Sequence, residues 1–514
     1  MATDAMSAPS TGMKPTLSLT GVTVNAMALI APGAFLWTTF ATQSAQSRAG
    51  SATAHAMWLG LLTSLVLAFL TAYSYSELAN LYPQAGTGSS YYFAEAALLQ
   101  KEKKQHFQYA RIAKFVVGWI SHLYYWIYPG IMAAFAGYLF QYIGGVAGWS
   151  LATDFKTVAA VVIVFTFLNA YVAYRGVSGS TMAAIIINAI QITALLGFSI
   201  WAIIFRLTHQ GLSYENGSVM DILGGSGDFA NVYYQGTIAI LLLVGFESIT
   251  SLGAETKNPK RDIRRGILLS LAIQGAIMYL FEYFAANLIV GDATIKGGYA
   301  GAAASAAPIG DMIHGMLNTQ TGQAIALIVS ATVLIALFGT MLACLNTGVR
   351  ITYAMGRDKE MPSLLGLLHG RFATPHFGIF VLAAVSAALG VYACTDLDHL
   401  AIITVASNFG TFLVYGMTNM IALVAFWSHH ERGFIKHRVV PFLGAAANAV
   451  MLVGVLYIAI QAGDNGVPGG NTASDAKKSL LIFAVWAVGG VAWFAINTMR
   501  LGKPAMVPAK ASAA

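Results

Sequence analysis

The stretch Val244-Gly245-Phe246-Glu247-Ser248 lies inside a strongly apolar segment of the chain, between residues 233 and 254. Glycine followed by an acid is notable there, because a carboxylate is costly at membrane depth and glycine loosens helical backbone. A second stretch, Ala31-Pro32-Gly33-Ala34, lies near the middle of the first apolar segment. Its proline removes a backbone donor and clashes with the preceding turn. Both patterns predict helices that are broken halfway along.

The composition around these stretches is that of a membrane protein. The 514 residues are 57% hydrophobic and 10% charged, with a mean hydropathy of +0.66, whereas soluble proteins carry about 25% charged residues. A soluble enzyme and a disordered chain are therefore excluded. The net charge of +7 is spread too thinly to form a nucleic-acid-binding face. Cys344 and Cys394 lie in apolar stretches, which indicates neither a disulfide framework nor a thiolate metal cluster.

Twelve apolar runs are long enough to cross a bilayer, which takes about 20 helical residues. They lie at residues 19–43, 55–81, 114–143, 155–173, 181–206, 233–254, 266–291, 323–354, 377–394, 400–427, 439–462 and 479–499. Only helices and closed barrels satisfy backbone polar groups in lipid, and these runs are too long for barrel strands. We therefore expect an all-α polytopic membrane protein, with no metal or cofactor, and with tails at residues 1–18 and 500–514.

The charges set the expected orientation. If the N-terminus is cytoplasmic, 22 of the 28 Lys and Arg residues fall in cytoplasmic segments, as the positive-inside rule predicts. Both termini are then cytoplasmic in a multi-pass protein of the cell membrane. Residues 82–111 hold a basic run that is either a short surface helix near anionic lipid or a solvated loop. The outer segment 292–322 is either a cover over an outer vestibule or a plain spacer.

Five ordered motifs resemble the amino acid-polyamine-organocation (APC) superfamily of transporters. The densest is Gly245-Phe246-Glu247 followed by residues 254–263, AETKNPKRDI, which is similar to the signature A-E-x-x-N-P-x-R-x-I. The others are Tyr75-Ser76-Glu77-Leu78-Ala79 with Tyr82-Pro83-Gln84-Ala85-Gly86, Gly118-Trp119, residues 350–362 (RITYAMGRDKEMP), and Thr374-Pro375. The resemblance implies a leucine-transporter-like fold of two inverted five-helix repeats at 19–427, with helices one and six broken and two added helices at 428–499.

The resemblance also implies a substrate site between the broken helices and span three. Its residues would be Leu29, Ala31, Pro32, Gly33, Ala34, Tyr124, Tyr125, Leu241, Val244, Gly245 and Phe246. Amides of Gly33 and Ala34 would receive a carboxylate at the positive end of a half-helix, and carbonyls of Leu29, Leu241 and Val244 would face an amino group. The family motif G-S-G-x-F is replaced by APGAF at residues 31–35, and Pro32 supplies no amide donor.

Proton coupling needs a titrating group in the spans. Some proton-coupled relatives carry a lysine in span five, and its place falls on Gln191 here, whose amide cannot titrate. The remaining candidates are Glu247, Glu77, Glu282 and His122. An acid at membrane depth is a functional hypothesis by default. The alternatives are a structural cap for Glu247, inner-gate network or interfacial packing for Glu77, a structural role for Glu282, and a hydrogen-bonded core histidine rather than a proton relay for His122.

Tyr124 and Tyr125 either line a pocket, where they can stack on a cation, or pack in the core. Certain polyamine importers that resemble this stretch bear an acid near the place of Tyr124, and this chain has no acid there. The absence of that acid disfavours a polycationic substrate. We expect a secondary active transporter for a small amino acid or related amine, working by alternating access with proton symport. An exchanger, a polytopic membrane enzyme and a non-transporting sensor remain alternatives.

Overall fold

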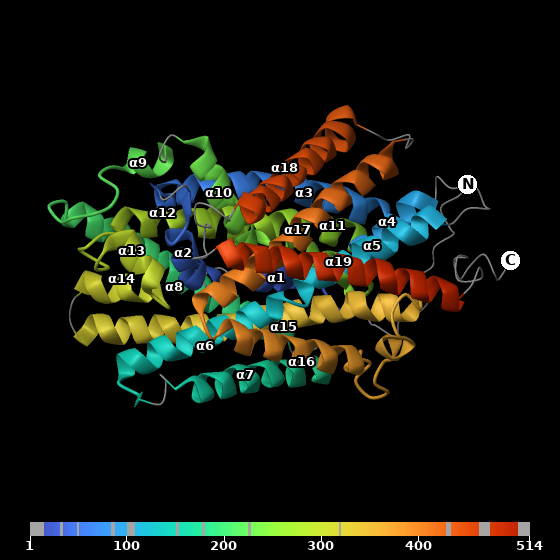
Figure 1. Cartoon of the computed structure of the whole chain (residues 1–514), viewed down its shortest axis with the longest axis horizontal. Coiled ribbons are helices and arrows are strands. Elements are labelled where there is room, and N and C mark those ends of the chain that lie inside the picture. The colour runs from blue at the N-terminus through green and yellow to red at the C-terminus, as the bar shows by residue number, and fades with distance from the viewer. Residues whose placement is uncertain are drawn as a thin grey trace.

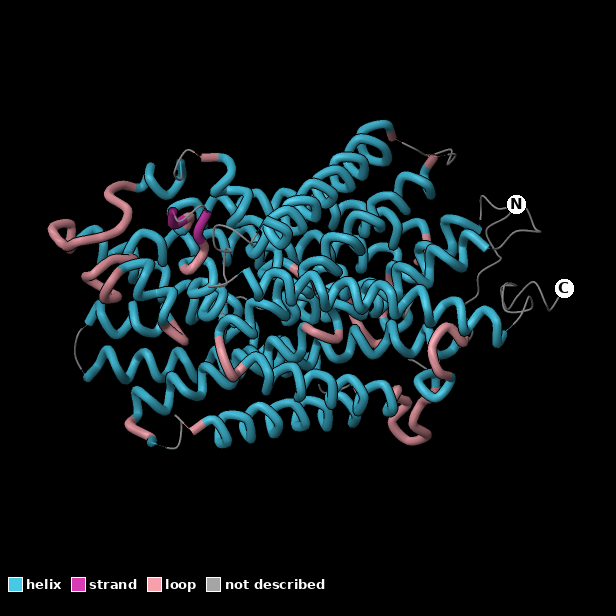
Figure 2. The backbone as a smooth tube through the Cα atoms, viewed as in Figure 1, coloured by secondary structure: helices cyan, strands magenta, loops and turns pink. Residues whose placement is uncertain are grey.

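The computed structural model describes residues 15–30, 34–48, 51–83, 88–99, 108–150, 154–176, 180–224, 228–317, 320–427, 433–461 and 473–501. Within these ranges the chain is a bundle of long helices that share one general direction (Figures 1 and 2). Eleven described segments are long and apolar enough to cross a membrane, and they correspond to predicted spans two to twelve. The shorter apolar helix α1 (Leu19–Ile30) is the first half of the first predicted span. The all-helical polytopic fold is thus confirmed.

Seven predicted spans are single α-helices, because their sequences are apolar throughout and contain no internal proline. They are α3 (Met57–Leu81), α7 (Phe155–Arg175), α8 (Ser180–Thr208), α15 (Gln320–Arg357), α16 (His376–Ala393), α17 (Leu397–Phe426) and α19 (Ala473–Leu501). An eighth, α18 (Val440–Gln461), is preceded by the π-helical turn η9 (Ile435–Val439).

Four other spans consist of more than one element. The first contains α1 and α2 (Ala34–Ser44), and the sixth contains α10 (Phe229–Ala239), η5 (Ile240–Leu243) and η6 (Phe246–Glu255). The third was expected to be one helix, but it is α5 (Gln108–Tyr125) followed by α6 (Tyr128–Ala147), with a proline at the start of α6. Proline is favoured in a first helical turn and disfavoured further in, which explains this division.

The seventh span was also expected to be continuous. It contains α11 (Pro259–Leu271), the π-helix η7 (Ala272–Tyr279) and α12 (Leu280–Ile289). Such π-segments are often found at functional sites, and η7 faces the first broken span, as described below. No residue pattern in the sequence distinguishes it from the α-helix on either side.

Short elements connect the spans. They are β1 (Ser47–Arg48) paired antiparallel with β2 (Ser51–Ala52), η1 (Ala54–Ala56), α4 (Ser90–Leu99), α9 (Val219–Gly224), α13 (Gly298–Ala304), α14 (Pro308–Leu317) and η8 (Ser363–Gly366). The outer segment 292–322 is therefore partly helical, and α13 and α14 both pack against α2. In the 82–111 segment, α4 has a buried face against α5 and α17; the basic run at 101–104 lies outside the described residues.

One end of the bundle collects basic side chains, most of them buried, and is called the basic end. It carries Arg111 and Lys114 at the start of α5, Arg264 on α11 and Arg350 near the end of α15. The C-terminal end of α19 lies at the same end (Figure 1). The opposite end carries α9, α13 and α14, which lie together at the left of Figure 1.

Candidate functional site

The predicted break in the sixth span is confirmed. Val244 has an extended backbone and Gly245 a φ of +130°, so the helix stops at Leu243 and restarts as the 3-10 helix η6 at Phe246. A Cβ atom on Gly245 would lie 2.9 Å from the Leu29 Cβ atom and 3.0 Å from the Ile30 amide nitrogen. Only glycine therefore allows this backbone conformation and this approach to the end of α1.

Glu247 lies directly beside the break and is buried, with 1% of its surface exposed. Its carboxylate accepts hydrogen bonds from the Tyr415 hydroxyl at 2.8 Å, the Tyr125 hydroxyl at 2.9 Å and the Gly245 amide at 3.0 Å, with the Tyr124 hydroxyl at 3.4 Å. In the described part of the chain, no Lys, Arg or His forms an ion pair with it. Neutral donors from η6, α5 and α17 thus satisfy a buried acid.

An aromatic cluster borders Glu247. The Phe246 ring lies 5.3 Å from the Tyr415 ring and 6.0 Å from the Tyr75 ring, centroid to centroid. The Tyr75 hydroxyl in turn accepts a hydrogen bond from Ser90 at 2.6 Å. Tyr75 and Tyr415 were absent from the predicted site. Tyr75 lies within a quoted motif, and Tyr415 follows a run of polar residues in span ten, but neither pattern indicates a neighbour of Glu247.

The described part of the first span ends against the seventh. The Tyr279 hydroxyl donates to the carbonyl of Ile30 at 2.5 Å, and the Gln274 amide donates to the carbonyl of Met27 at 3.4 Å. Side chains of the π-helix thereby satisfy carbonyls that the end of α1 leaves without helical partners. Of the predicted site residues here, Leu29 is buried against Gly245. Ala31, Pro32 and Gly33 lie outside the described residues, and Ala34 begins α2.

The remaining predicted backbone ligands lie on the other side of the break. The carbonyl of Leu241 accepts a hydrogen bond from the Tyr128 hydroxyl at 2.6 Å, so a side chain from α6 binds the group expected to face a substrate amine. Val244 and Phe246 are buried beside it. The structure therefore brings together Leu29, Tyr124, Tyr125, Leu241, Val244, Gly245, Phe246 and Glu247 around the junction of α1 with η6.

Two of the coupling candidates, Glu77 and His122, lie in different surroundings. Glu77, near the end of α3, pairs with Arg264 at 2.7 Å and lies 3.3 Å from His437. His122 makes contacts of 2.6 Å to the Gly118 carbonyl and 2.9 Å to the Thr352 hydroxyl, as a hydrogen-bonded core histidine does. Neither belongs to the hydrogen-bond set around Glu247.

Glu282 and Gln191 are both buried at membrane depth. Neither carboxylate oxygen of Glu282 has a hydrogen-bond partner among the described residues, and the same is true of the Gln191 amide nitrogen. They lie on α12 and α8, two helices that pack together. Within the described ranges, no group of three or more His, Cys, Asp or Glu side chains is arranged to hold a metal ion.

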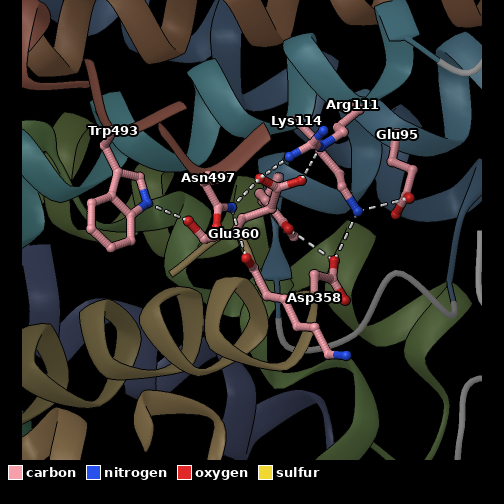
Figure 3. Close-up of polar contacts among 9 residues, drawn as sticks. Glu95, Arg111, Lys114, Asp358, Glu360, Trp493 and Asn497 are labelled. Carbon is pink, nitrogen blue, oxygen red and sulfur yellow. Dashed lines mark hydrogen bonds and ion pairs between the residues drawn. The ribbon is translucent and has the colours of Figure 1, made fainter. Parts of the chain in front are cut away.

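The structure also contains a cluster that the sequence did not suggest. At the basic end, Arg111 pairs with Glu360 at 2.6 Å, and Lys114 pairs with both Glu95 and Asp358 at 2.9 Å (Figure 3). We call this group, with Trp493 and Asn497 of α19, the frame cluster. Burial raises the pKa of the Glu95 carboxyl on α4, while the nearby Lys114 ammonium opposes that shift. These basic residues were read only as topology signals.

The amino acid permease family model matches residues 21–503, nearly the whole chain. The chain belongs to the amino acid permease family. Within it, this permease is 24% identical to the low-affinity putrescine importer PlaP of Escherichia coli strain K12, over 96% of this chain and 95% of the importer.

Two further relatives differ in their named substrates. The branched-chain amino acid permease BcaP of Lactococcus lactis is 26% identical over 65% of this permease and 67% of BcaP. The methylthioribose transporter of Bacillus subtilis is 26% identical over 72% and 74% of the two chains. The family is thus one of membrane transporters, and the named substrates of these relatives are chemically diverse.

Proposed function

We propose that this permease is a secondary active transporter that moves a small amino acid or related amine by alternating access, driven by proton symport. The observation that carries the proposal is the set of donors on Glu247 at the point where η6 meets α1. Because Glu247 is buried at a helix break, the side chain that would bind the proton lies next to the backbone that would bind the substrate.

Protonation of Glu247 changes what its neighbours can do. As a carboxylate, Glu247 accepts bonds from Tyr125, Tyr415 and the Gly245 amide. As a neutral acid it becomes a donor at one oxygen, and a tyrosine hydroxyl beside that oxygen must then reverse its role and accept. A proton on the oxygen that faces the Gly245 amide and Tyr415 weakens the bond from that amide, which can only donate. A released Gly245 amide loosens the turn between η5 and η6. Proton binding and rearrangement of the break are therefore one event in this proposal.

The substrate lies at the same junction. Its carboxylate binds the amides of Gly33, which lies outside the described residues, and of Ala34, the first residue of α2, where the helix dipole favours an anion. Its amino group faces the carbonyls of Leu29 and Val244, with Tyr124 and Tyr125 alongside, and shares the carbonyl of Leu241 with the Tyr128 hydroxyl. In the described part of the site, Glu247 is the one acid and its acceptor positions are filled by neutral donors. A zwitterion or a monoamine fits this nearly neutral site better than a diamine does.

Both termini are cytoplasmic in this proposal, and the protein lies in the cell membrane. The excess of basic residues at the basic end favours that orientation. A tag at either terminus should be cleaved by an impermeant protease only when the cytoplasmic face is exposed. Cleavage of a tag in sealed, right-side-out vesicles would show that this terminus faces outward and would contradict the proposed orientation.

The substrate class is tested by the thermal stability of the purified protein. Zwitterionic amino acids, monoamines, putrescine and methylthioribose would each be added at increasing concentration, because a ligand that binds only the folded state raises Tm. We expect stabilisation by one amino acid or monoamine, and none by putrescine. Tight binding of putrescine or methylthioribose, with no response to amino acids or monoamines, would contradict the proposed substrate class.

A further inference from the structure

The segment that precedes α1 is joined to the end of η6 through the backbone. The amides of Thr16 and Leu17 both donate to the carbonyl of Glu255 at 2.9 Å, and the Lys257 amide donates to the carbonyl of Leu17 at 2.9 Å. Leu17 and Thr256 form a parallel bridge. Because each of the two broken spans supplies one side of this joint, α1 and η6 are linked at the basic end.

One ion pair joins this linked unit to α15, in addition to the packing of α1 and η6 against that helix. The Arg350 guanidinium lies 2.7 Å from the Glu255 carboxylate, and the two side chains are 9% and 14% exposed. Arg350 belongs to α15 and Glu255 is the last residue of η6. Among the described residues, this is the ion pair that joins η6 to α15.

The position of this pair relative to the site follows from helix geometry. Glu247 and Glu255 are eight residues apart in η6, and a 3-10 helix rises about 2.0 Å per residue, so the pair lies about 16 Å along η6 from Glu247. It therefore stands between the candidate site and the basic end of the bundle. A path that runs along η6 from the site to that end passes the place where η6 meets α15.

The frame cluster holds the loop that directly follows α15. Arg111 and Lys114 of α5 pair with Glu360 and Asp358, directly after α15. The Trp493 indole of α19 donates to the Glu360 carbonyl at 2.7 Å, and the Asn497 amide donates to the Lys359 carbonyl at 2.8 Å. In Figure 3 these side chains reach the loop from opposite sides. Several buried polar contacts thus join α5 and α19 to the loop after α15. Among the described residues, η6 meets α15 through one ion pair and through packing.

We propose that the Glu255–Arg350 ion pair is the latch that keeps the basic end of the transport path closed. It separates when α1 and η6 move together away from α15, while the frame cluster keeps α5, α15 and α19 in place. Glu255 and Arg350 are thus positioning residues that act on access to the site and do not contact the substrate. The inference rests on the proposed alternating access, which transporters of this kind achieve by moving one bundle against another.

The native Cys344 reports whether the path is open. Cys344 is fully buried on α15 and lies close enough to Glu247 for the two side chains to interact electrostatically. The chain's other cysteine, Cys394, is replaced by serine so that only Cys344 can react. An impermeant maleimide is added to vesicles with the basic end exposed, and the labelling rate of Cys344 is measured. This measurement requires no substrate and no transport.

We expect Glu255→Gln and Arg350→Gln each to raise the labelling rate about tenfold, through a shifted population of open and closed states. The exchanged pair Glu255→Arg/Arg350→Glu should restore slow labelling. Arg350→Lys keeps the charge and should give an intermediate rate. In proteoliposomes the single variants should change the KM for uptake from the opposite side more than kcat, since fewer molecules face that side.

The matched control is the frame cluster. Arg111→Gln and Glu360→Gln remove an ion pair of similar length and burial at the same end. They should lower Tm and leave the labelling rate of Cys344 within about twofold of the parent. Unchanged labelling in both latch variants, or an equal increase in the frame variants, would overturn the proposal. Absence of uptake with normal latch behaviour would instead contradict only the proposed transport function.

Discussion

Glu247 lies at membrane depth, and among the described residues no Lys, Arg or His forms an ion pair with it. Hydrogen-bond donors stabilise its carboxylate instead. Three donors lie at 2.8 to 3.0 Å, from Tyr415, Tyr125 and the Gly245 amide. Hydrogen bonds to a charged group stabilise it by about 1.5 to 3 kcal/mol each, whereas an isolated buried charge is far more costly. The tyrosines therefore determine whether this acid can be charged inside the bundle.

The contribution of these donors can be measured by removing single hydroxyls. Tyr415→Phe deletes the donor at 2.8 Å and should destabilise the charged form of Glu247 by about 1.5 to 3 kcal/mol. The pH dependence of uptake should then shift to higher pH, because a proton is held more tightly. Tyr124→Phe deletes a hydroxyl at 3.4 Å and serves as the control. An equal shift in the two variants would show that the hydrogen-bond lengths do not determine the effect.

Gly245 provides a second test at the residue scale. Gly245→Ala places a Cβ atom 2.9 Å from Leu29, at a φ that side-chain-bearing residues rarely adopt. We expect loss of uptake and a markedly lower Tm. Gly197→Ala on α8 meets no atom within 4 Å and should leave both quantities unchanged or raise Tm slightly. Full uptake by Gly245→Ala would refute the requirement for close approach at the break.

Some of these residues were predictable and others were not. Glu247 and Gly245 could be predicted because an acid and a glycine stand out in an apolar run. Tyr124 and Tyr125 were left between a pocket role and packing, and the structure places both hydroxyls near Glu247. Tyr415 could not be found, because it lies 168 residues away in sequence and meets Glu247 only through the packing of α17.

At the scale of elements, the local sequence predicted the breaks in spans one and six. It did not predict the division of span three or the π-helix in span seven. Proline and glycine near residue 32 and glycine at 245 act on their own backbone, so the sequence shows them. The π-helix η7 has no such signal, because its conformation is coupled to contacts that Gln274 and Tyr279 make with α1. The division of span three was missed although Pro129 lies at the start of α6.

The final helix α19 offers a test of the frame cluster as an element. Trp493→Phe with Asn497→Leu removes two hydrogen bonds to the loop after α15, each worth about 0.5 to 1.5 kcal/mol. We expect a lower Tm for the purified protein, because these carbonyls lose their partners. Val491→Ala on the exposed side of α19 should have little effect. If the double variant is as stable as this control, α19 does not hold the loop.

At the scale of the whole molecule, the basic residues have two roles that the sequence does not separate. The excess of Lys and Arg in one set of segments predicts orientation, while the apolar runs predicted a span arrangement that agrees with the structure. The same pattern does not reveal that Arg111, Lys114 and Arg350 are largely buried in ion pairs. Their acidic partners lie far away in sequence, so only the assembled bundle identifies the frame cluster and the latch.

The central claim is that Glu247 couples a proton gradient to substrate movement, and accumulation in proteoliposomes tests it most directly. Radiolabelled substrate, chosen by the thermal-stability measurements, would be followed with and without an imposed pH gradient for the native protein and for Glu247→Gln. We predict gradient-driven accumulation by the native protein and loss of that accumulation in Glu247→Gln. Full gradient-driven accumulation by Glu247→Gln, or no substrate flux by the native protein under any gradient, would contradict the account.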